Sequence, residues 1–233
     1  MIAISILITL QTLLSNSDYS KACTHDEMNT NNTFHFLMND EPENSTTYGL
    51  GMVSFDYTTH PTIYFYTYNI KSESYLDLQP YDSIVFNNIP YNESEIISAP
   101  PYLMPAHMKM DYGLLLFKII SITKNFIEIE VNASLEQTAW VSREVCNIML
   151  WPEFMLNVYS VEIMDTIQNP LRVVPFSHGS QLMYHAYSIL QPVQIKGDWM
   201  QVILYDGNLN KLDEGWIRWR ENNKLLVNYS LLC

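Results

Sequence analysis

The sequence predicts an all-β protein that contains two copies of one small β-module. Short runs rich in β-branched and aromatic residues recur along the chain, separated by polar turn residues. No long segment has the 3.6-residue apolar period of a helix. The second half also repeats its own pattern, and a fixed long period is typical of repeated structural units.

The N-terminal region, residues 23–98, is predicted to be β-rich. The chain has 16 tyrosines, and tyrosine suits half-buried strands because its ring packs while its hydroxyl stays in water. A sugar- or peptide-binding surface is the alternative interpretation of so many tyrosines. The expected strands lie at 34–38, 52–57, 62–68, 75–78 and 83–86.

A proline-rich segment at 99–105 ends this series of strands. Proline cannot donate to a strand ladder, so the segment is expected at a surface or sheet edge, where it opens the first module, 99–160. The best helical candidate is 151–156, because Pro152 suits a first helical turn, and continuation of a strand is the alternative. The second module is assigned to 161–233.

The repeat itself consists of three matching parts. Each copy has a hairpin-like segment, then a polar loop followed by tryptophan and a β-branched residue, and then a short apolar strand. The two copies are expected to form the same small structure. The matching parts are 122–131 with 195–204, Trp140 with Trp216, and 148–151 with 224–227.

Two motifs of the second module carry a family resemblance. Gly197, Trp199 and Val202 form a G-x-W-x-x-V hairpin, and residues 215–217 read G-W-I. The module resembles bacterial SH3-like domains, in which such a hairpin is followed by a G-W-[IV] strand that closes a small barrel. The first module has Phe and Ala in place of the first Trp and the second Gly. The resemblance implies two SH3-like small barrels in tandem with a β-rich N-terminal extension, and the whole chain is similar to secreted Bacteroidota proteins with such modules.

Residues 1–22 are predicted to be a secretory signal peptide. The apolar run 1–14 is too short to span a bilayer, and Ser20 and Ala22 flank one residue before a cleavage site. We therefore expect an exported protein, periplasmic, outer-membrane-associated or secreted, without direct membrane insertion after signal removal. A buried first strand is the alternative. Cys23 leaves a lipid anchor open, although Ser20 stands where a lipobox has a Leu-like residue.

The charge balance bears on partners. The net charge is −13, from 12 basic and 25 acidic residues. A field of this sign repels phosphate backbones, so no nucleic acid is expected to bind, and anionic lipid surfaces are disfavoured for the same reason.

Cysteine chemistry gives one catalytic hypothesis. SH3-like modules often accompany cysteine peptidases that cut cell-wall peptides, which makes Cys146 with His178 or His185 a candidate pair. A reactive cysteine needs a site that lowers its pKa, such as a helix start, whereas Cys146 lies between two expected strands. A structural loop residue is therefore favoured. Cys146 and Cys233 are expected to be unpaired thiols, with a disulfide as the alternative.

No cofactor or metal site is predicted. The six histidines show no ligand-type spacing. Asp198, Asp206 and Asp213 flank one hairpin, and we interpret them as solvated turn acids rather than calcium ligands.

The predicted function is that of a non-enzymatic binding module for a cell-envelope peptide or glycan, or a partner protein. An enzyme with an unrecognised catalytic unit in the tyrosine-rich region 52–86 is the alternative, and a structural assembly role stands third. Trp199 and Trp216 are expected to pack in the core. Arg218 and Arg220 either bind a carboxylate or neutralise Asp213 and Glu214. The candidate binding residues are Tyr184, Tyr187, Arg218, Trp219 and Arg220.

Overall fold

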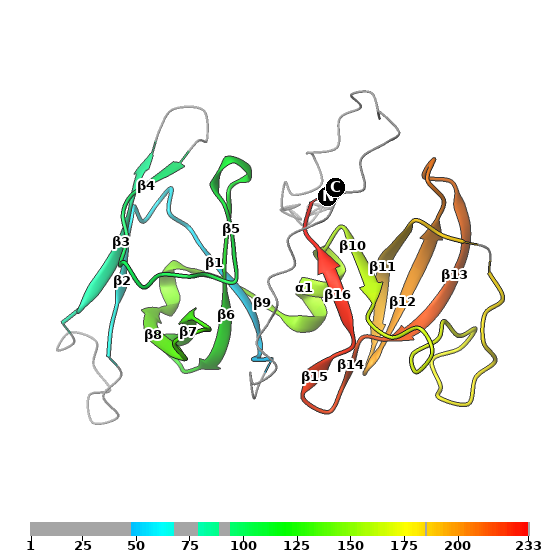
Figure 1. Ribbon diagram of the computed structural model, residues 1–233. Coiled ribbons are helices and arrows are strands. Elements are labelled where there is room, and N and C mark those ends of the chain that lie inside the picture. The colour runs from blue at the N-terminus through cyan, green and yellow to red at the C-terminus, as the bar shows by residue number, and fades with distance from the viewer. Residues whose placement is uncertain (1–47, 68–78, 89–93, 185, 233) are drawn as a thin grey trace, which may run out of the picture.

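The computed structural model describes residues 48–67, 79–88, 94–184 and 186–232. Within these ranges the protein is all-β, as predicted: it has two large antiparallel sheets, two small ones and a single α-helix, which lies between the two large sheets (Figure 1). Several predictions fall outside the described residues: the signal segment 1–22, Cys23, His185, Cys233 and the strands at 34–38 and 75–78.

The first large sheet has the strand order β8-β7-β6-β1-β9, and every neighbouring pair is antiparallel. A short strand, β5, pairs with β6 beside this path. Short 3-10 turns, η3 (Met110–Tyr112) and η4 (Arg143–Val145), precede β6 and β9. The strands are β1 (Gly51–Phe55), β5 (His107–Lys109), β6 (Leu114–Ile122), β7 (Phe126–Asn132), β8 (Gln137–Ser142) and β9 (Cys146–Leu150).

The second large sheet has the order β13-β12-β11-β10-β16, again antiparallel throughout. A two-stranded ribbon, β14 (Arg220–Glu221) with β15 (Lys224–Leu225), joins β13 to β16. The sheet strands are β10 (Ser160–Ile163), β11 (Ile189–Lys196), β12 (Trp199–Tyr205), β13 (Lys211–Arg218) and β16 (Val227–Ser230).

The two sheets share one topology, because the strand order of the first maps position by position onto that of the second. The repeated segments 122–131 and 195–204 form the corresponding hairpins, β6–β7 and β11–β12. The equivalence extends to the edge strands. Trp140 exchanges two backbone hydrogen bonds with Tyr66, and Trp216 does the same with Arg172. The predicted repeat is therefore a repeated five-stranded sheet.

The expectation of closed barrels needs correction. In the described chain the edge strands β8 and β9 form no ladder with each other, and neither do β13 and β16. The edge strands that carry Trp140 and Trp216 are each paired at a single β-bridge, with Tyr66 and Arg172 respectively. Strand β1, from the N-terminal region, is hydrogen-bonded between β6 and β9 and so belongs to the first large sheet.

The first core lies between the first large sheet and a small sheet of order β2-β3-β4. Phe65 and Ile84 of the small sheet are fully buried against Phe117 and Ile129 of the large one. These strands belong to the long connection between β1 and β6. They are β2 (Thr62–Phe65), β3 (Asp82–Asn88) and β4 (Ser94–Ser98).

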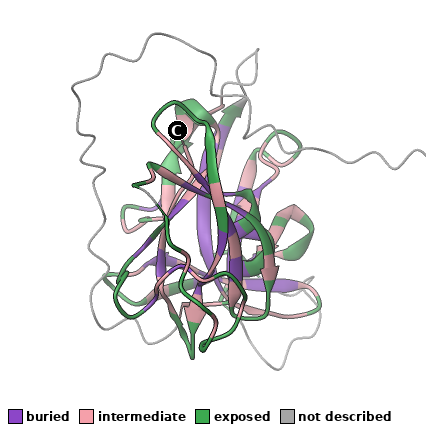
Figure 2. Ribbon diagram, turned by 90° about the vertical axis from the view of Figure 1, so that its right-hand side faces the viewer, coloured by how far each residue is buried: buried purple, intermediate pink, exposed green. Residues whose placement is uncertain are grey.

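Strand β6 is buried on both faces. Leu115 and Phe117 point into the first core, while Leu114 and Leu116 belong to a second core shared with the second sheet. Burial on both faces accounts for the unbroken apolar run at the start of this strand, since an alternating pattern needs one wet face. Buried residues accordingly concentrate on the inner strands and exposed ones on the loops (Figure 2).

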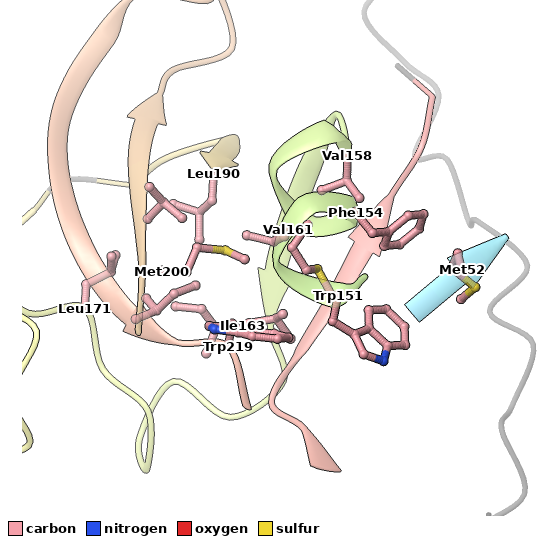
Figure 3. Packing of buried hydrophobic residues seen from close by; sticks show 14 of the residues in the cluster. Met52, Trp151, Phe154, Val158, Val161, Ile163, Leu171, Leu190, Met200 and Trp219 are labelled. Atoms are coloured by element: carbon pink, nitrogen blue, oxygen red, sulfur yellow. The ribbon is translucent and has the colours of Figure 1, made fainter. Parts of the chain in front are cut away.

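The α-helix, α1 (Trp151–Asn157), confirms the expectation of a helix at 151–156, with proline in its first turn. Trp151 and Phe154 lie between Met52 of the first sheet and Leu190 and Met200 of the second (Figure 3). The Trp151 indole Nε1–H donates to the carbonyl oxygens of Tyr48 and Gly49, both at 3.1 Å. The helix thus connects the two sheets through one continuous apolar cluster.

Candidate functional site

The predicted binding residues lie at two opposite ends of the second sheet. Tyr187 lies next to the end where Ser188 pairs with Tyr205, whereas Arg218 pairs with Trp199 at the other end of β12. At roughly 3.3 Å per residue, the length of β12 separates the two ends by about 20 Å. The five residues therefore do not form one site.

Trp219 is a core residue and not a surface contact. Its side chain is fully buried, with 0 % exposure, and its Nε1–H donates to the carbonyl oxygen of Gly197 at 3.0 Å. The backbone N–H of Trp219 donates to the carbonyl oxygen of Asp198 at 3.1 Å, which fixes the hairpin turn against the start of β14. The prediction that Trp219 presents an exposed ring is wrong, because the face that it shares with Ile217 is the buried one.

Arg220 connects the two halves of the molecule. Its guanidinium lies 4.8 Å from the Trp219 ring centroid and pairs with Asp198, with Nε 2.7 Å from Oδ1. Its Nη1 also donates to the Tyr48 hydroxyl at 2.9 Å, and Tyr48 stacks on Trp151. The Arg220 guanidinium therefore already has partners within the chain: Asp198, Tyr48 and the Trp219 ring.

Arg218 also has an internal carboxylate partner. It pairs with Glu221, and its guanidinium lies 5.5 Å from the ring centroid of half-buried Trp199. The amide of buried Asn169 holds its backbone, donating to the Arg218 carbonyl oxygen at 2.7 Å and accepting from its N–H at 3.0 Å. Asp213 and Glu214 are not the carboxylates that the two arginines neutralise, since Arg218 pairs with Glu221 and Arg220 with Asp198.

Tyr184 and Tyr187 contact each other at the opposite end, with ring centroids 5.4 Å apart and planes tilted by 50°. Tyr184 is exposed, while Tyr187 is half-buried against the second core. Burial raises the pKa of the Tyr187 phenol, and the nearby Glu162 adds to the effect. The pair keeps one accessible ring at the end of the connection between β10 and β11.

That connection carries a surface that sequence analysis missed, which we call the 173–184 loop. No residue in it is Asp, Glu, Lys or Arg, although the chain as a whole is strongly acidic. Its apolar side chains project outward: Val173 and Phe176 are each 53 % exposed and Met183 is 91 % exposed. Phe176 also stacks on His178, with ring centroids 5.7 Å apart. The signal that could have identified this loop is a stretch without charged residues, outside any expected strand, in an acidic chain.

The 173–184 loop has a defined backbone conformation. Val173 N–H donates to Ser180 oxygen at 3.0 Å, and Gly179 N–H donates to Phe176 oxygen at 2.9 Å. At its base Arg172 bonds the backbone of Trp216 and sends its Nη1 to the Gly179 oxygen at 2.6 Å. The loop therefore presents its exposed side chains from a fixed frame.

Gly215 is the reason that this loop can dock on β13. A Cβ at position 215 would lie 3.0 Å from Leu182 Cδ2 and 3.2 Å from both the Arg172 oxygen and Leu171 Cδ2. Leu171 is almost fully buried, so the loop is anchored in the core on each side. The expectation that Trp216 packs in the core is wrong, since Gly215 and Ile217 face the core and Trp216 is half-buried on the other face.

No protein-family model, curated protein or solved structure matches this chain. The SH3-like resemblance therefore stays a proposal.

The cysteine hypothesis is not supported by the surroundings of Cys146. Cys146 opens β9, with its Sγ–H donating to the Ser142 oxygen at 3.2 Å, and burial raises the pKa of the thiol to about 12. His178 stacks on Phe176 in the loop of the second sheet, while Cys146 belongs to the first sheet. A catalytic thiol requires the opposite direction of shift.

We expect Cys146 to react slowly in the native chain. At pH 8 a thiol of pKa about 12 is roughly one ten-thousandth ionised, so alkylation by iodoacetamide should be at least about 100-fold slower than in urea. Peptide-resolved mass spectrometry measures this rate separately from the other cysteines. Equal rates in native and unfolded chains would contradict the burial of this thiol.

Tyrosines of the N-terminal region make packing contacts. Tyr57 stacks on Phe86 at 4.8 Å, and Tyr66 packs edge-on against Phe126 at 5.5 Å. Burial is the main cause that raises the pKa of Tyr66 above its ordinary value. A phenol with a raised pKa is a poor acid or base near neutral pH, so these contacts give no support to a catalytic unit there.

The three aspartates of the second hairpin region bind groups within the chain. Asp206 accepts hydrogen bonds from the backbone N–H groups of Asn208 and Asn210, both at 2.8 Å. Asp213 accepts from the Glu214 N–H, and Asp198 pairs with Arg220. Over the described ranges, no three His, Cys, Asp or Glu side chains lie together as a metal site. In the same ranges, no helix has the length and apolar character needed to cross a bilayer.

Proposed function

We propose that this chain is an exported, non-enzymatic binding protein made of two SH3-like units. In this proposal it recognises a cell-envelope peptide or glycan, or a partner protein, through the 173–184 loop and the adjoining Tyr187. The observation that carries the proposal is the loop's set of exposed apolar side chains on a hydrogen-bonded frame. Several large apolar side chains left exposed within one 12-residue loop favour an interaction site over singly scattered surface residues.

The SH3-like part of the proposal draws on the arrangement of the second sheet. The G-x-W-x-x-V segment runs from the turn at Gly197 into β12, and the G-W-I segment lies beside it in β13, as the family pattern implies. The common strand order extends the argument to the first unit. The open sheets are a departure from the closed family barrel.

The exposed apolar side chains of the loop favour an apolar ligand surface. Burying apolar area is worth about 25 cal/mol per Å², and Phe176 is already about half-buried, so complete burial of Phe176 and Met183 contributes roughly 2–4 kcal/mol before entropic costs. A loop that is already ordered loses little conformational freedom on binding, which leaves more of this contribution as affinity. Tyr184 adds a ring with a polar edge, which suits a peptide or a sugar.

Retention on envelope material tests the proposal. The chain from Thr24 onward is incubated with peptidoglycan sacculi and a glycan panel, alongside the double variant Phe176→Ser, Met183→Ser. We expect the parent to be retained and the variant to lose at least about ten-fold in retention, since each lost contact is worth 1 kcal/mol or more.

A matched control is available in the first unit. Ile97 and Leu135 are 64 % and 63 % exposed, so Ile97→Ser, Leu135→Ser removes a similar amount of exposed apolar surface elsewhere. This control should bind like the parent. Equal loss in both double variants would contradict the assignment of the loop, and failure of the parent to bind any of the materials would remove the envelope ligand.

A further inference from the structure

One polar contact joins the two sheets directly. His107 lies on β5 at the edge of the first sheet, opposite Leu116, and Tyr229 lies on β16 at the edge of the second, opposite Val161. The His107 Nε2 and the Tyr229 hydroxyl are 2.8 Å apart, and their rings meet edge-on with centroids 5.4 Å apart. The two residues are 122 positions apart in sequence.

The surroundings of this contact are aromatic and apolar. Tyr229 packs edge-on against Phe154 at 5.1 Å and against Trp151 at 6.2 Å, both on α1. Leu116 of β6 belongs to the same cluster. An imidazole in such a setting is stable as the neutral form, with one ring nitrogen as donor and the other as acceptor.

The charged groups on the neighbouring elements are engaged elsewhere or exposed. On β6, Lys118 pairs with Glu130 at 2.9 Å, and on β5 the Lys109 ammonium lies over the Tyr112 ring at 4.0 Å. Glu153 of α1 and Glu162 of β10 are solvent-exposed, and the remaining titratable group is the Tyr229 phenol. In the described chain, no carboxylate pairs with His107 that would hold an imidazolium in place.

We propose that the His107–Tyr229 contact is an acid-sensitive latch, in which protonation of His107 releases β5 from β16 and lets these two edge strands fray while the central strands of both sheets stay folded. The Arg220–Tyr48 bond and the packing of α1 form a second connection that remains. Release therefore frays the two edge strands and does not separate the units.

The direction of the pH effect follows from burial. Burial lowers the pKa of His107 to about 4, below the ordinary value of about 6.5. The open form therefore takes up the proton first, so closure is complete above pH 6.5 and weakens as the pH falls toward 4. The difference corresponds to a closing equilibrium about 300-fold weaker below pH 4 than at neutral pH.

Hydrogen exchange of the full chain, followed by mass spectrometry from pH 7 to pH 4 and corrected for intrinsic rates, tests the latch. Protection of β5 and β16 should fall at least ten-fold more than that of the central strands β7 and β12. His107→Gln, which cannot become charged, should remove this selective loss. His178→Gln changes a histidine in an exposed loop and should keep it.

Three results would overturn the latch. They are an equal fall in β5 and β7, an unchanged selective loss in His107→Gln, or an NMR titration of the parent that gives His107 a pKa of 6.5 or above. The titration needs no variant, so the proposal can be decided even where His107→Gln fails to fold. Because no ligand is used, the outcome is independent of the proposed binding function.

Discussion

Replacing Trp219 by alanine is expected to lower the free energy of unfolding by about 3–5 kcal/mol. The side chain is completely buried, and its loss leaves a cavity in the core that the two sheets share. The carbonyl oxygen of Gly197 also loses its indole donor. Urea unfolding followed by circular dichroism measures the difference.

Trp199→Ala is the matched control, because Trp199 starts the same hairpin but is only half-buried. We expect it to cost no more than about 1–2 kcal/mol. A small effect of Trp219→Ala together with lost ligand binding would restore the interpretation of Trp219 as a surface contact.

Replacing Gly51 by alanine should also destabilise the protein strongly. A Cβ at this position would lie 2.2 Å from the carbonyl oxygen of Met149 and 2.7 Å from the Cα of Leu150. Both are backbone atoms of β9, so β1 and β9 must move apart. We expect a loss of about 2–4 kcal/mol, measured by the same urea unfolding.

Gly207→Ala provides the comparison for this substitution. The nearest heavy atom to its Cβ would be Ser188 Oγ at 3.6 Å, which is an ordinary contact. The change should stay within about 0.5 kcal/mol of the parent. An equally small effect of Gly51→Ala on the free energy of unfolding would contradict the close packing of the β1 backbone at Gly51 against the β9 backbone.

Local features of the fold could be predicted from the sequence. Runs of β-branched and aromatic residues identified the strands around Val53, Ile63 and Ile84, because alternating burial leaves its period in the chain. The similarity of 122–131 to 195–204 identified two hairpins. Pro152 identified the start of α1.

Pairing between distant segments was beyond the sequence pattern. Nothing in the residues of β1 indicates that it lies between β6 and β9, since strand partners across a long connection leave no local period. The contact between His107 and Tyr229 has the same character, because it depends on how two sheets meet.

The candidate site shows where alternation alone fails. Alternation puts Trp219 on the same face as Ile217 and the two arginines on the other, but it does not say which face is exposed to solvent. The 173–184 loop has no period, and only its lack of charge in an acidic chain marks it.

Strand β6 has a consequence for how the protein can be divided. Its Leu114 and Leu116, with Met52 of the neighbouring strand, complete the core of the other half through α1. The second half therefore lacks a finished interior of its own, whereas the first half keeps a separate core between its two sheets. A fragment cut near residue 158 would leave apolar surface exposed on both pieces. Deleting or transplanting either copy alone would therefore expose part of the shared core.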